Sequence, residues 1–257
     1  IISTHSPEIA AYYKPNEINI VETQEDGNTK VSPLVEKNTP PQNALMRLFT
    51  IYRKETSEAL MHSKIIIPEG VSEFYWLNKL VSAFITTEGW DVTDTIASFG
   101  IIPTQDSNVV QSYIALSRIG TFLIPFVDGD AAGNGYVTNL KNEVQKPPFI
   151  LQLKDTHFLE HLIAWIILPN NQQEEDKLKA ILDQKQIDYY NINALGALLA
   201  SDYKSYWKVH DELIEIMVGT PAFSQKVKNL IKALDKIVKG CDPSTLNPEW
   251  VINANVS

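Results

Sequence analysis

The chain has 257 residues, 44% of them hydrophobic and 21% charged, with a formal net charge of −9 and one cysteine, Cys241. This length allows one large domain or two small ones with a sizeable core. The composition excludes a disordered chain, and no apolar run reaches the roughly 18 residues of a membrane helix. A single cysteine excludes an internal disulfide framework and fits a reducing cytosol. The negative charge argues against a broad positive surface for nucleic acid, though not against a protein whose own site is acidic.

The first residues indicate a segment of a larger protein. The chain starts at Ile1 without an initiator Met and without the charged leader of a signal peptide. Ser6-Pro7 is typical of a helix start, with the serine as cap and the proline at the first helical position. Short strands are expected over 18–22 and 30–34, and Asp26-Gly27-Asn28 between them is a hairpin signal.

A first carboxylate is expected at the end of a buried strand. A helix from Asn43 to Met61 comes first, as a structural link, and the apolar run 64–70 then predicts a short strand that ends in Glu69. A helix follows directly, and Glu73 in its first turn can point back toward the same opening. The alternative for Glu73 is an acid that only stabilises the helix N-terminus. The expected inner stripe of this helix is Phe74, Leu77, Val81 and Phe84.

A second strand end carries two aspartates. The apolar run from Phe122 leads into Asp128-Gly129-Asp130-Ala131-Ala132-Gly133, a turn of small residues. Residues i and i+2 of a strand share a side, so Asp128 and Asp130 can face one point. Hard anionic oxygens of this kind suit Mg²⁺ or Mn²⁺. Two aspartates in this spacing are also common in ordinary solvated turns.

The remaining elements predict an α/β fold. Strands are expected over 95–99 and 148–153, and helices over 107–119 and 156–167, the last containing Glu160. Strands that alternate with helices imply a parallel sheet with crossover connections. Pro125 inside the strand that leads to Asp128 removes a ladder hydrogen bond, so we expect a bulge or an edge position there.

The C-terminal part predicts helices and an irregular tail. Helices are expected over 176–184, 192–200, 204–218 and 223–239, and the tail from Gly240 is expected to be irregular. Lys228, Lys232 and Lys236 are spaced by four on the last helix, which indicates either a solvated face or a track for phosphate groups. His157 and His161 share a helical face, but a zinc site would need a third nitrogen or sulfur ligand.

Together these motifs resemble a known family. Ser63 to Glu73, followed by Asp128-Gly129-Asp130-Ala131-Ala132-Gly133, is similar to the TOPRIM domain of OLD (overcoming lysogenization defect) family nucleases, which include the Gabija-type nuclease subunit. In that family the end of an ABC ATPase head, carrying a Ser-Thr-His-Ser-Pro motif, precedes the TOPRIM domain. Ser3 to Pro7 matches that motif in the same order, so the resemblance spans about residues 1–168.

The resemblance implies four parts and a metal site. The parts are an ATPase remnant over 1–38, a helical linker over 39–62, a Rossmann-like TOPRIM domain over 63–168 with its parallel sheet flanked by helices, and a C-terminal helical subdomain over 169–257. The metal ligands would be Glu69, Glu73, Asp128, Asp130 and Glu160. Pro68 stands where the family has Val, and His161 where Asp is common.

The resemblance also implies roles for other residues. His5 would sense the ATP γ-phosphate, but no G-x-x-x-x-G-K-[ST] motif is present, so these residues alone cannot hydrolyse ATP. The family has a functional lysine in the C-terminal helical region, for which Lys226 is the first choice and Lys228 the second. Lys228, Lys232 and Lys236 would contact DNA.

The expected function is that of a metal-dependent DNA endonuclease that hydrolyses phosphodiesters with two Mg²⁺ or Mn²⁺ ions. Glu69, Asp128, Asp130 and Lys226 would be the catalytic residues. A topoisomerase-like transesterification is a relative of this hypothesis, with Tyr75 and Tyr136 near the motifs.

Two rivals come from other classes. One is a non-catalytic TOPRIM module that serves assembly or regulation in an ABC ATPase complex. The other is a phosphotransferase of the HAD type, which predicts a threonine after the second aspartate and its glycine, where this chain has Ala131-Ala132. Beyond DNA, the resemblance implies a homo-oligomer formed through the ATPase head, and a helicase-like or other defence-system partner. It further implies a bacterial cytoplasmic protein without membrane contact, ATP binding through the missing part of the head, and a role against phage.

Overall fold

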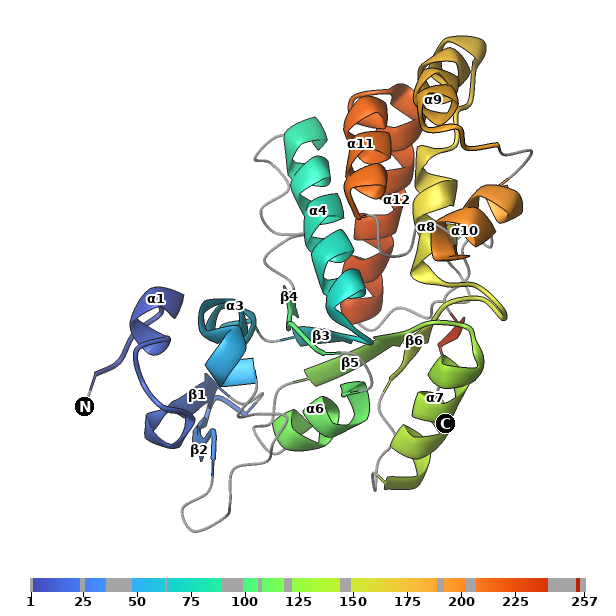
Figure 1. Ribbon diagram of the computed structural model, residues 1–257. Coiled ribbons are helices and arrows are strands. Elements are labelled where there is room, and N and C mark those ends of the chain that lie inside the picture. The colour runs from blue at the N-terminus through green and yellow to red at the C-terminus, as the bar shows by residue number, and fades with distance from the viewer. Residues whose placement is uncertain are drawn as a thin grey trace.

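A central β-sheet organises the computed structural model of the chain (Figure 1). The sheet has the strand order β4-β3-β5-β6-β7. Its strands are β3 (Lys64–Pro68), β4 (Gly100–Ile101), β5 (Phe122–Val127), β6 (Leu151–Gln152) and β7 (Asn253–Ala254). The first four in this order are parallel, and β7 pairs with β6 in the antiparallel sense. The structure describes residues 2–23, 26–35, 48–62, 64–88, 99–105, 108–117, 122–143, 149–188, 192–201, 207–239 and 253–254.

Helices cover both faces of this sheet, which explains why β3 after Lys64 and all of β5 are apolar. Alternate residues of β3 point to opposite faces: Ile66 packs with α4 (Val71–Glu88) and α8 (Leu159–Ile167), whereas Ile65 and Ile67 pack in a second core. The helices of the second core are α3 (Arg53–Ala59), α6 (Val109–Leu116) and α7 (Ala131–Glu143). The α/β fold with a parallel sheet is therefore confirmed.

The C-terminal helices share the core of α4 and α8. They are α9 (Gln172–Lys185), α10 (Ile192–Ser201), α11 (Trp207–Met217) and α12 (Pro221–Val238). Figure 1 shows them rising with α4 from one face of the sheet. Asn171 and Thr220 cap α9 and α12 by accepting hydrogen bonds from backbone amides. In the described part of the chain no helix has the length and apolar character to cross a membrane.

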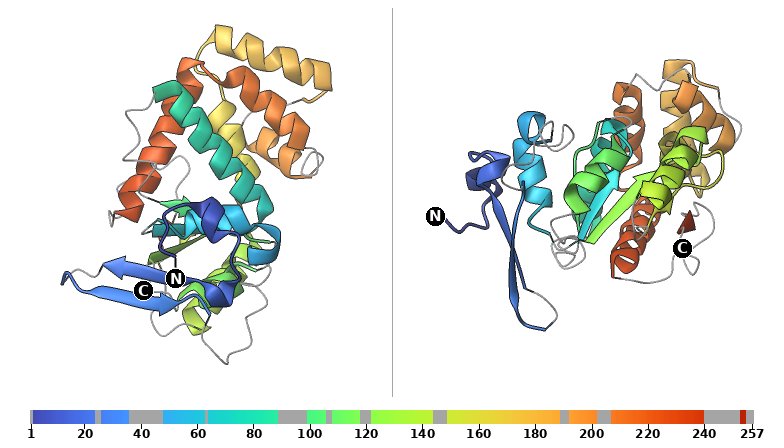
Figure 2. Two further views of the ribbon diagram at one scale, coloured as in Figure 1. Left: turned by 90° about the vertical axis from the view of Figure 1, so that its left-hand side faces the viewer. Right: turned by 90° about the horizontal axis from the view of Figure 1, so that it is seen from below.

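The N-terminal residues form a small unit beside the sheet. A short α1 (Pro7–Ala10) has Ser6 as its N-cap, and the short 3-10 helix η1 (Pro15–Glu17) leads to β1 (Asn19–Thr23). β1 pairs antiparallel with β2 (Thr29–Pro33), as the turn residues predict. The resulting hairpin projects from the body of the molecule (Figure 2). His5 is exposed, and a role in nucleotide sensing stays a prediction.

Pro125 lies in the middle of the sheet, so the expected bulge or edge position was wrong. It pairs with Ile67 of β3 on one side. On the other side, within the described residues, the ladder between β5 and β6 includes Phe126 and Val127 only. The proline therefore precedes the residues that pair with β6, and its missing N–H does not interrupt that ladder.

Several element boundaries differ from expectation. The linker helix is interrupted at Tyr52, whose φ of −126° and ψ of 49° are not helical, and residues 43–47 are outside the described part. The helix that carries Glu160 starts at Leu159, because Thr156 has a φ of 65°. The expected strand over 95–99 falls outside the described residues except for Phe99. In the tail, Asn253–Ala254 forms β7 where an irregular segment was expected.

The inner face of α4 is also wider than the four-residue stripe expected. Leu77 and Phe84 are buried as predicted, but Phe74 and Val81 are only partly buried. The buried apolar residues of α4 are Trp76, Leu77, Leu80, Ala83 and Phe84. The reason is that α4 contacts α12 as well as the sheet, so a second side of the helix is covered.

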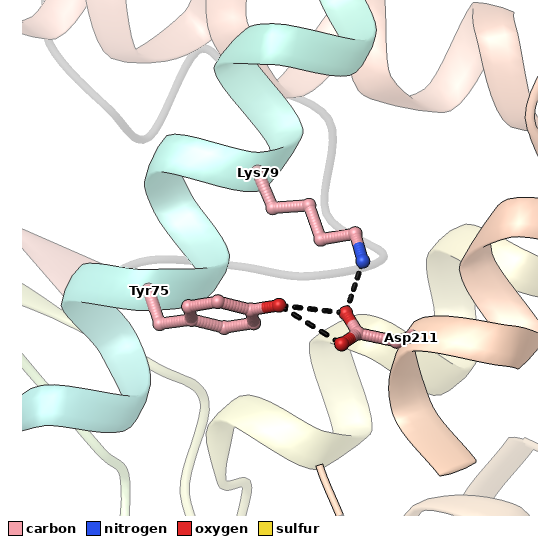
Figure 3. Close-up of polar contacts among 3 residues, drawn as sticks. All are labelled: Tyr75, Lys79 and Asp211. Carbon is pink, nitrogen blue, oxygen red and sulfur yellow. Dashed lines mark hydrogen bonds and ion pairs between the residues drawn. The ribbon is translucent and has the colours of Figure 1, made fainter. Parts of the chain in front are cut away.

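A polar contact ties α11 to α4 (Figure 3). The Tyr75 hydroxyl donates to the two carboxylate oxygens of Asp211 at 2.8 and 2.9 Å, and Lys79 forms an ion pair with the same carboxylate. Burial, followed by the hydrogen bond to Asp211, raises the pKa of Tyr75 to about 12. A phenol held in its protonated form as a donor is poorly suited to act as a nucleophile, so this tyrosine serves helix packing.

We predict that Asp211→Ala destabilises the protein by about 1–3 kcal/mol, because Tyr75 and Lys79 would lose a shared charged acceptor at a partly buried site. The free energy of unfolding from urea titration measures this. Glu215→Ala, an exposed acid on the same helix, is the matched control and is expected to change stability by less than about 0.5 kcal/mol. Equal effects of the two substitutions would contradict the role given to Asp211.

Candidate functional site

The junction of β3 and β5 is where a ligand is expected in this sheet. β3 pairs with both β4 and β5. The chain leaves β3 through α4 on one face and leaves β5 through α7 on the other. In open α/β sheets such a point opens a crevice outside the carboxyl ends of the two strands. Glu69 follows β3, and Asp128 follows β5.

Asp128 is held by three hydrogen bonds and is 7% exposed. Its Oδ1 accepts a hydrogen bond from Leu159 N at the start of α8, at 3.0 Å. Its own N–H donates to Glu69 Oε2, also at 3.0 Å. Its carbonyl oxygen accepts from Gln152 Nε2 at 3.3 Å. The two strand ends are thereby linked in space, as the sequence predicted.

The other acids belong to helix starts around the same junction. Asp130 Oδ1 accepts from Gly133 N at 2.7 Å and so caps the first turn of α7. Glu73 lies in the first turn of α4 and Glu160 in the first turn of α8, and both are buried. Each position is favourable for a negative charge at a helix N-terminus, which means that the helix dipoles offset part of the cost of burial.

The five carboxylates repel one another. Burial, reinforced by Glu73, Glu69, Glu160 and Asp130, raises the pKa of Asp128 from 3.8 to about 9. Burial, reinforced by Glu69 and Glu160, raises the pKa of Glu73 from 4.5 to about 7. Since charge repulsion falls with distance, these influences indicate that the five carboxylates lie in the same region, and we call the five together the acidic cluster.

The donors fit a hard divalent cation, but the cluster is not arranged as a preformed cage. Carboxylate oxygens are what Mg²⁺ and Mn²⁺ bind. Among the described residues, however, no group of three or more His, Cys, Asp or Glu side chains could hold a metal ion as it stands. The contacts explain this, because Glu69, Asp128 and Asp130 each direct one oxygen to a backbone amide. A cation would need the carboxylates to turn toward one another.

Two glycines allow the turn between Asp128 and α7 to pack closely. A Cβ on Gly129 would lie 1.9 Å from the carbonyl oxygen of Lys154, and one on Gly133 would lie 2.0 Å from that of Asp128. Gly129 N also donates to His157 O, and its oxygen accepts from Thr156 N, each at 2.8 Å. The turn is therefore docked against the loop that leads from β6 to α8.

Gln152 and Asn134 are site residues that sequence reasoning missed. Gln152 ends β6 and is 7% exposed. Besides the Asp128 carbonyl, its Nε2 binds Asn134 Oδ1 in α7 at 2.8 Å. The sequence held one signal, since a glutamine among the apolar residues of a buried strand needs hydrogen-bond partners. It did not indicate which partners these would be.

The two histidines are neighbours of the cluster with different tautomers. His161 Nδ1 accepts from Phe158 N at 3.1 Å, which leaves the proton on Nε2. His157 Nδ1 lies 3.0 Å from the carbonyl oxygen of Asp155, so this nitrogen carries the proton. The two ring centroids are 4.9 Å apart. Burial and the nearby His157 lower the pKa of His161.

The structure does not bring Lys226 to the acidic cluster. Its Nζ donates to the carbonyl oxygens of Trp165 and Leu168, at 2.9 and 2.6 Å, and so caps the C-terminal end of α8. Glu160 lies at the opposite end of this nine-residue helix, which spans roughly 12 Å at 1.5 Å per residue. The contact assigns Lys226 to the packing of α8 rather than to the reacting centre.

The three lysines spaced by four on α12 differ in their surroundings. Lys228 forms an ion pair with Glu88 at the end of α4, with an Nζ–Oε2 distance of 2.6 Å. Lys232 and Lys236 are exposed on the same helix. Of the three residues expected to contact DNA, these last two keep that role as a prediction, and the charge of Lys228 is compensated.

We predict that Gly129→Ala costs roughly 2–3 kcal/mol or more of stability, because its Cβ would overlap a backbone oxygen that cannot move away without shifting the β6–α8 loop. Gly135→Ala is the matched control on the neighbouring α7. Within the described part of the chain, no heavy atom other than those of its chain neighbours and its own helix backbone lies within 4 Å of the point that its Cβ would occupy, and the helix is expected to gain up to about 1 kcal/mol. Thermal unfolding of both variants measures the difference, and a neutral Gly129→Ala would contradict the close docking.

We also predict that the metal-free protein loses stability as the pH rises from about 4 to about 9. A carboxyl group with a raised folded-state pKa holds its proton in the native state while the unfolded state has lost it, so increasing pH favours unfolding across this window. Asp128→Asn, which keeps the acceptor for Leu159 N, is expected to be more stable than the wild type at pH 8 by at least about 1.4 kcal/mol, the equivalent of one pKa unit.

Urea titrations in EDTA at pH 5 and pH 8 measure this effect. Asp155→Asn is the control, because Asp155 is exposed and its substitution is expected to leave the pH dependence unchanged. An Asp128→Asn variant that loses as much stability as the wild type between the two pH values would show that Asp128 does not titrate in this range.

Comparisons with known proteins add a structural likeness. No protein-family model and no curated protein matches the chain. Its structure is similar to the C-terminal region of the Burkholderia pseudomallei OLD protein, at 12% identity and a TM-score of 0.34, over 69% of this chain and 97% of that chain. It is also similar to the C-terminal region of the Xanthomonas campestris pv. campestris OLD protein, at 14% identity and a TM-score of 0.32, over 69% and 97% of the two chains. Both proteins carry the name of the family that the sequence motifs resemble, and at these values neither likeness assigns a role to any residue.

Proposed function

We propose that this chain carries the catalytic part of a metal-dependent DNA endonuclease. The observation that carries the proposal is the acidic cluster, five carboxylates that approach one another at the carboxyl ends of β3 and β5 and raise the pKa of Asp128 and Glu73. Such repulsion is relieved when a cation binds. The order of the acidic motifs, which resembles that of a TOPRIM domain, supports DNA as the substrate.

Glu69, Asp128 and Asp130 are the residues that would hold the cations, with Glu73 and Glu160 completing the set. Divalent cations there would supply Lewis-acid activation of water and would offset the charge of the phosphate. The hydrogen bond from Gly133 N holds the Asp130 carboxylate at the start of α7. Protons on Asp128 and Glu73 compete with cations, so cation affinity is expected to rise with pH.

The remaining chain would bind and orient the substrate. Lys232 and Lys236 lie on the outer side of α12, and phosphate contacts from lysines position DNA without reading its sequence. The projecting N-terminal unit is proposed to belong to an ATPase head that controls the site. The oligomer, the defence-system partner and the role against phage follow from the family resemblance and belong to the same proposal.

The rival from another class is a non-catalytic module that uses the same fold for assembly. It would have no need to bury acids that repel one another, because an assembly surface can be built without charges that oppose folding. The retained cluster therefore favours a cation-binding site. The two functions differ in one measurable property, the cleavage of DNA.

We predict that the intact protein nicks supercoiled plasmid in the presence of Mg²⁺ or Mn²⁺, and that EDTA abolishes the nicking. Asp128→Ala is expected to lower the rate by at least about a hundredfold, since a cation ligand and its charge are removed. Asp155→Ala, an exposed acid on the β6–α8 loop, is the control expected to keep wild-type activity.

The outcomes separate the hypotheses. Nicking by the wild type that Asp128→Ala abolishes supports the proposal and its site. Nicking that survives Asp128→Ala would place the chemistry elsewhere. If no protein nicks DNA with any cation, while the variants remain folded by circular dichroism, the assembly module is the better explanation.

A further inference from the structure

We infer that Gln152, acting through Asn134, is a positioning residue that sets the geometry of the proposed cation site and thereby its preference for Mg²⁺. This inference rests on the proposed function. It concerns a side chain outside the acidic motifs that touches both the strand end carrying Asp128 and the helix that follows Asp130.

The amide of Gln152 joins two elements at the cluster. It stands next to Val127 in the register of β5 and β6. From there Nε2 donates to the Asp128 carbonyl oxygen at 3.3 Å and to Asn134 Oδ1 at 2.8 Å. A backbone carbonyl can only accept, so the nitrogen must face Asp128 and the orientation of this amide is determined by its partners.

These contacts close a ring around the aspartate turn. Asn134 N donates to the Asp130 carbonyl oxygen at 3.0 Å, within the first turn of α7. The hydrogen bonds therefore run from Asp128 through Gln152 and Asn134 to Asp130, which belongs to the same turn as Asp128. The ring ties the main chain at Asp128 to the main chain at Asp130, so a shift of one relative to the other would strain at least one of these hydrogen bonds. A buried amide left without partners is costly.

The ring bears on the choice of cation. Mg²⁺ requires nearly ideal octahedral geometry with short bonds, whereas Ca²⁺ accepts irregular arrangements of oxygen ligands. A turn whose main chain is fixed limits the positions that the two carboxylates can reach when they turn toward a cation, which favours the strict geometry of Mg²⁺. Loosening the turn is therefore expected to weaken Mg²⁺ binding more than Ca²⁺ binding. Partners that orient ligands in this way typically change metal affinity by roughly 10–100-fold when they are removed.

The test uses Gln152→Leu, which keeps the approximate size of the side chain and removes its donor. Thermal unfolding of the full chain is followed during titration with Mg²⁺ alone and with Ca²⁺ alone, because a cation that binds the folded state raises the melting temperature. The Mg²⁺ concentration at half-maximal stabilisation is expected to rise at least about tenfold, and that of Ca²⁺ by less than about threefold. Gln152→Glu, which cannot donate to either oxygen, is expected to behave no better than Gln152→Leu toward Mg²⁺.

Gln225→Leu is the matched control. It breaks another glutamine–asparagine contact, from Gln225 Nε2 to Asn229 Oδ1 at 2.8 Å on α12, and both cation midpoints should stay at their wild-type values. If Gln152→Leu shifts both midpoints equally or not at all, while Asp128→Asn abolishes the stabilisation, the positioning role is wrong and the cation site stands. If no cation stabilises the wild-type protein, the proposed function and this inference fail together.

Discussion

Like charges held in little water are the constraint on which this arrangement depends. Asp128, Glu73 and Glu160 are 7%, 8% and 4% exposed, and burial together with mutual repulsion raises the pKa of the first two. A cluster of buried acids opposes folding unless hydrogen bonds from its surroundings stabilise the carboxylates, or unless a proton or a cation neutralises their charge. The contacts around the junction of β3 and β5 supply these hydrogen bonds. The raised pKa values mean that Asp128 and Glu73 keep their protons to higher pH than ordinary carboxyl groups do. A cation would replace those protons.

The topology of the sheet explains why the acids lie beside helix starts. Two crossovers leave β3 and β5 on opposite faces of the sheet, so helix starts converge beside the strand ends. Backbone amides of those starts satisfy Asp128 and Asp130. The turn between them docks on the β6–α8 loop through Gly129, where a Cβ would overlap backbone atoms. Packing of α4 against α11 and α12 determines the position of α4 and therefore that of Glu73 in its first turn.

Three lysines of the helical layer bind partners that lie outside the acidic cluster. Lys226 binds the carbonyl oxygens at the end of α8, and Lys228 pairs with Glu88. Lys79 pairs with Asp211 in the contact between α4 and α11. These three lysines stabilise the packing of helices, and their ammonium groups are directed to partners other than the acidic cluster. A lysine ammonium that paired with the carboxylates of the acidic cluster would compete with a divalent cation for them.

Local patterns in the sequence determined the apolar strands, the hairpin at Gly27 and the acids that follow β3 and β5, because strand alternation and turn chemistry depend on near neighbours alone. The family resemblance added the other acids of the acidic cluster, and these five carboxylates as metal ligands stay a prediction. Tertiary structure alone decided that Pro125 lies in a central strand, that α8 starts at the residue whose amide binds Asp128, and that Gln152 joins Asp128 to Asn134. It alone placed Lys226 at the far end of α8. These outcomes depend on which elements become neighbours, and burial across distant parts of the chain determines that.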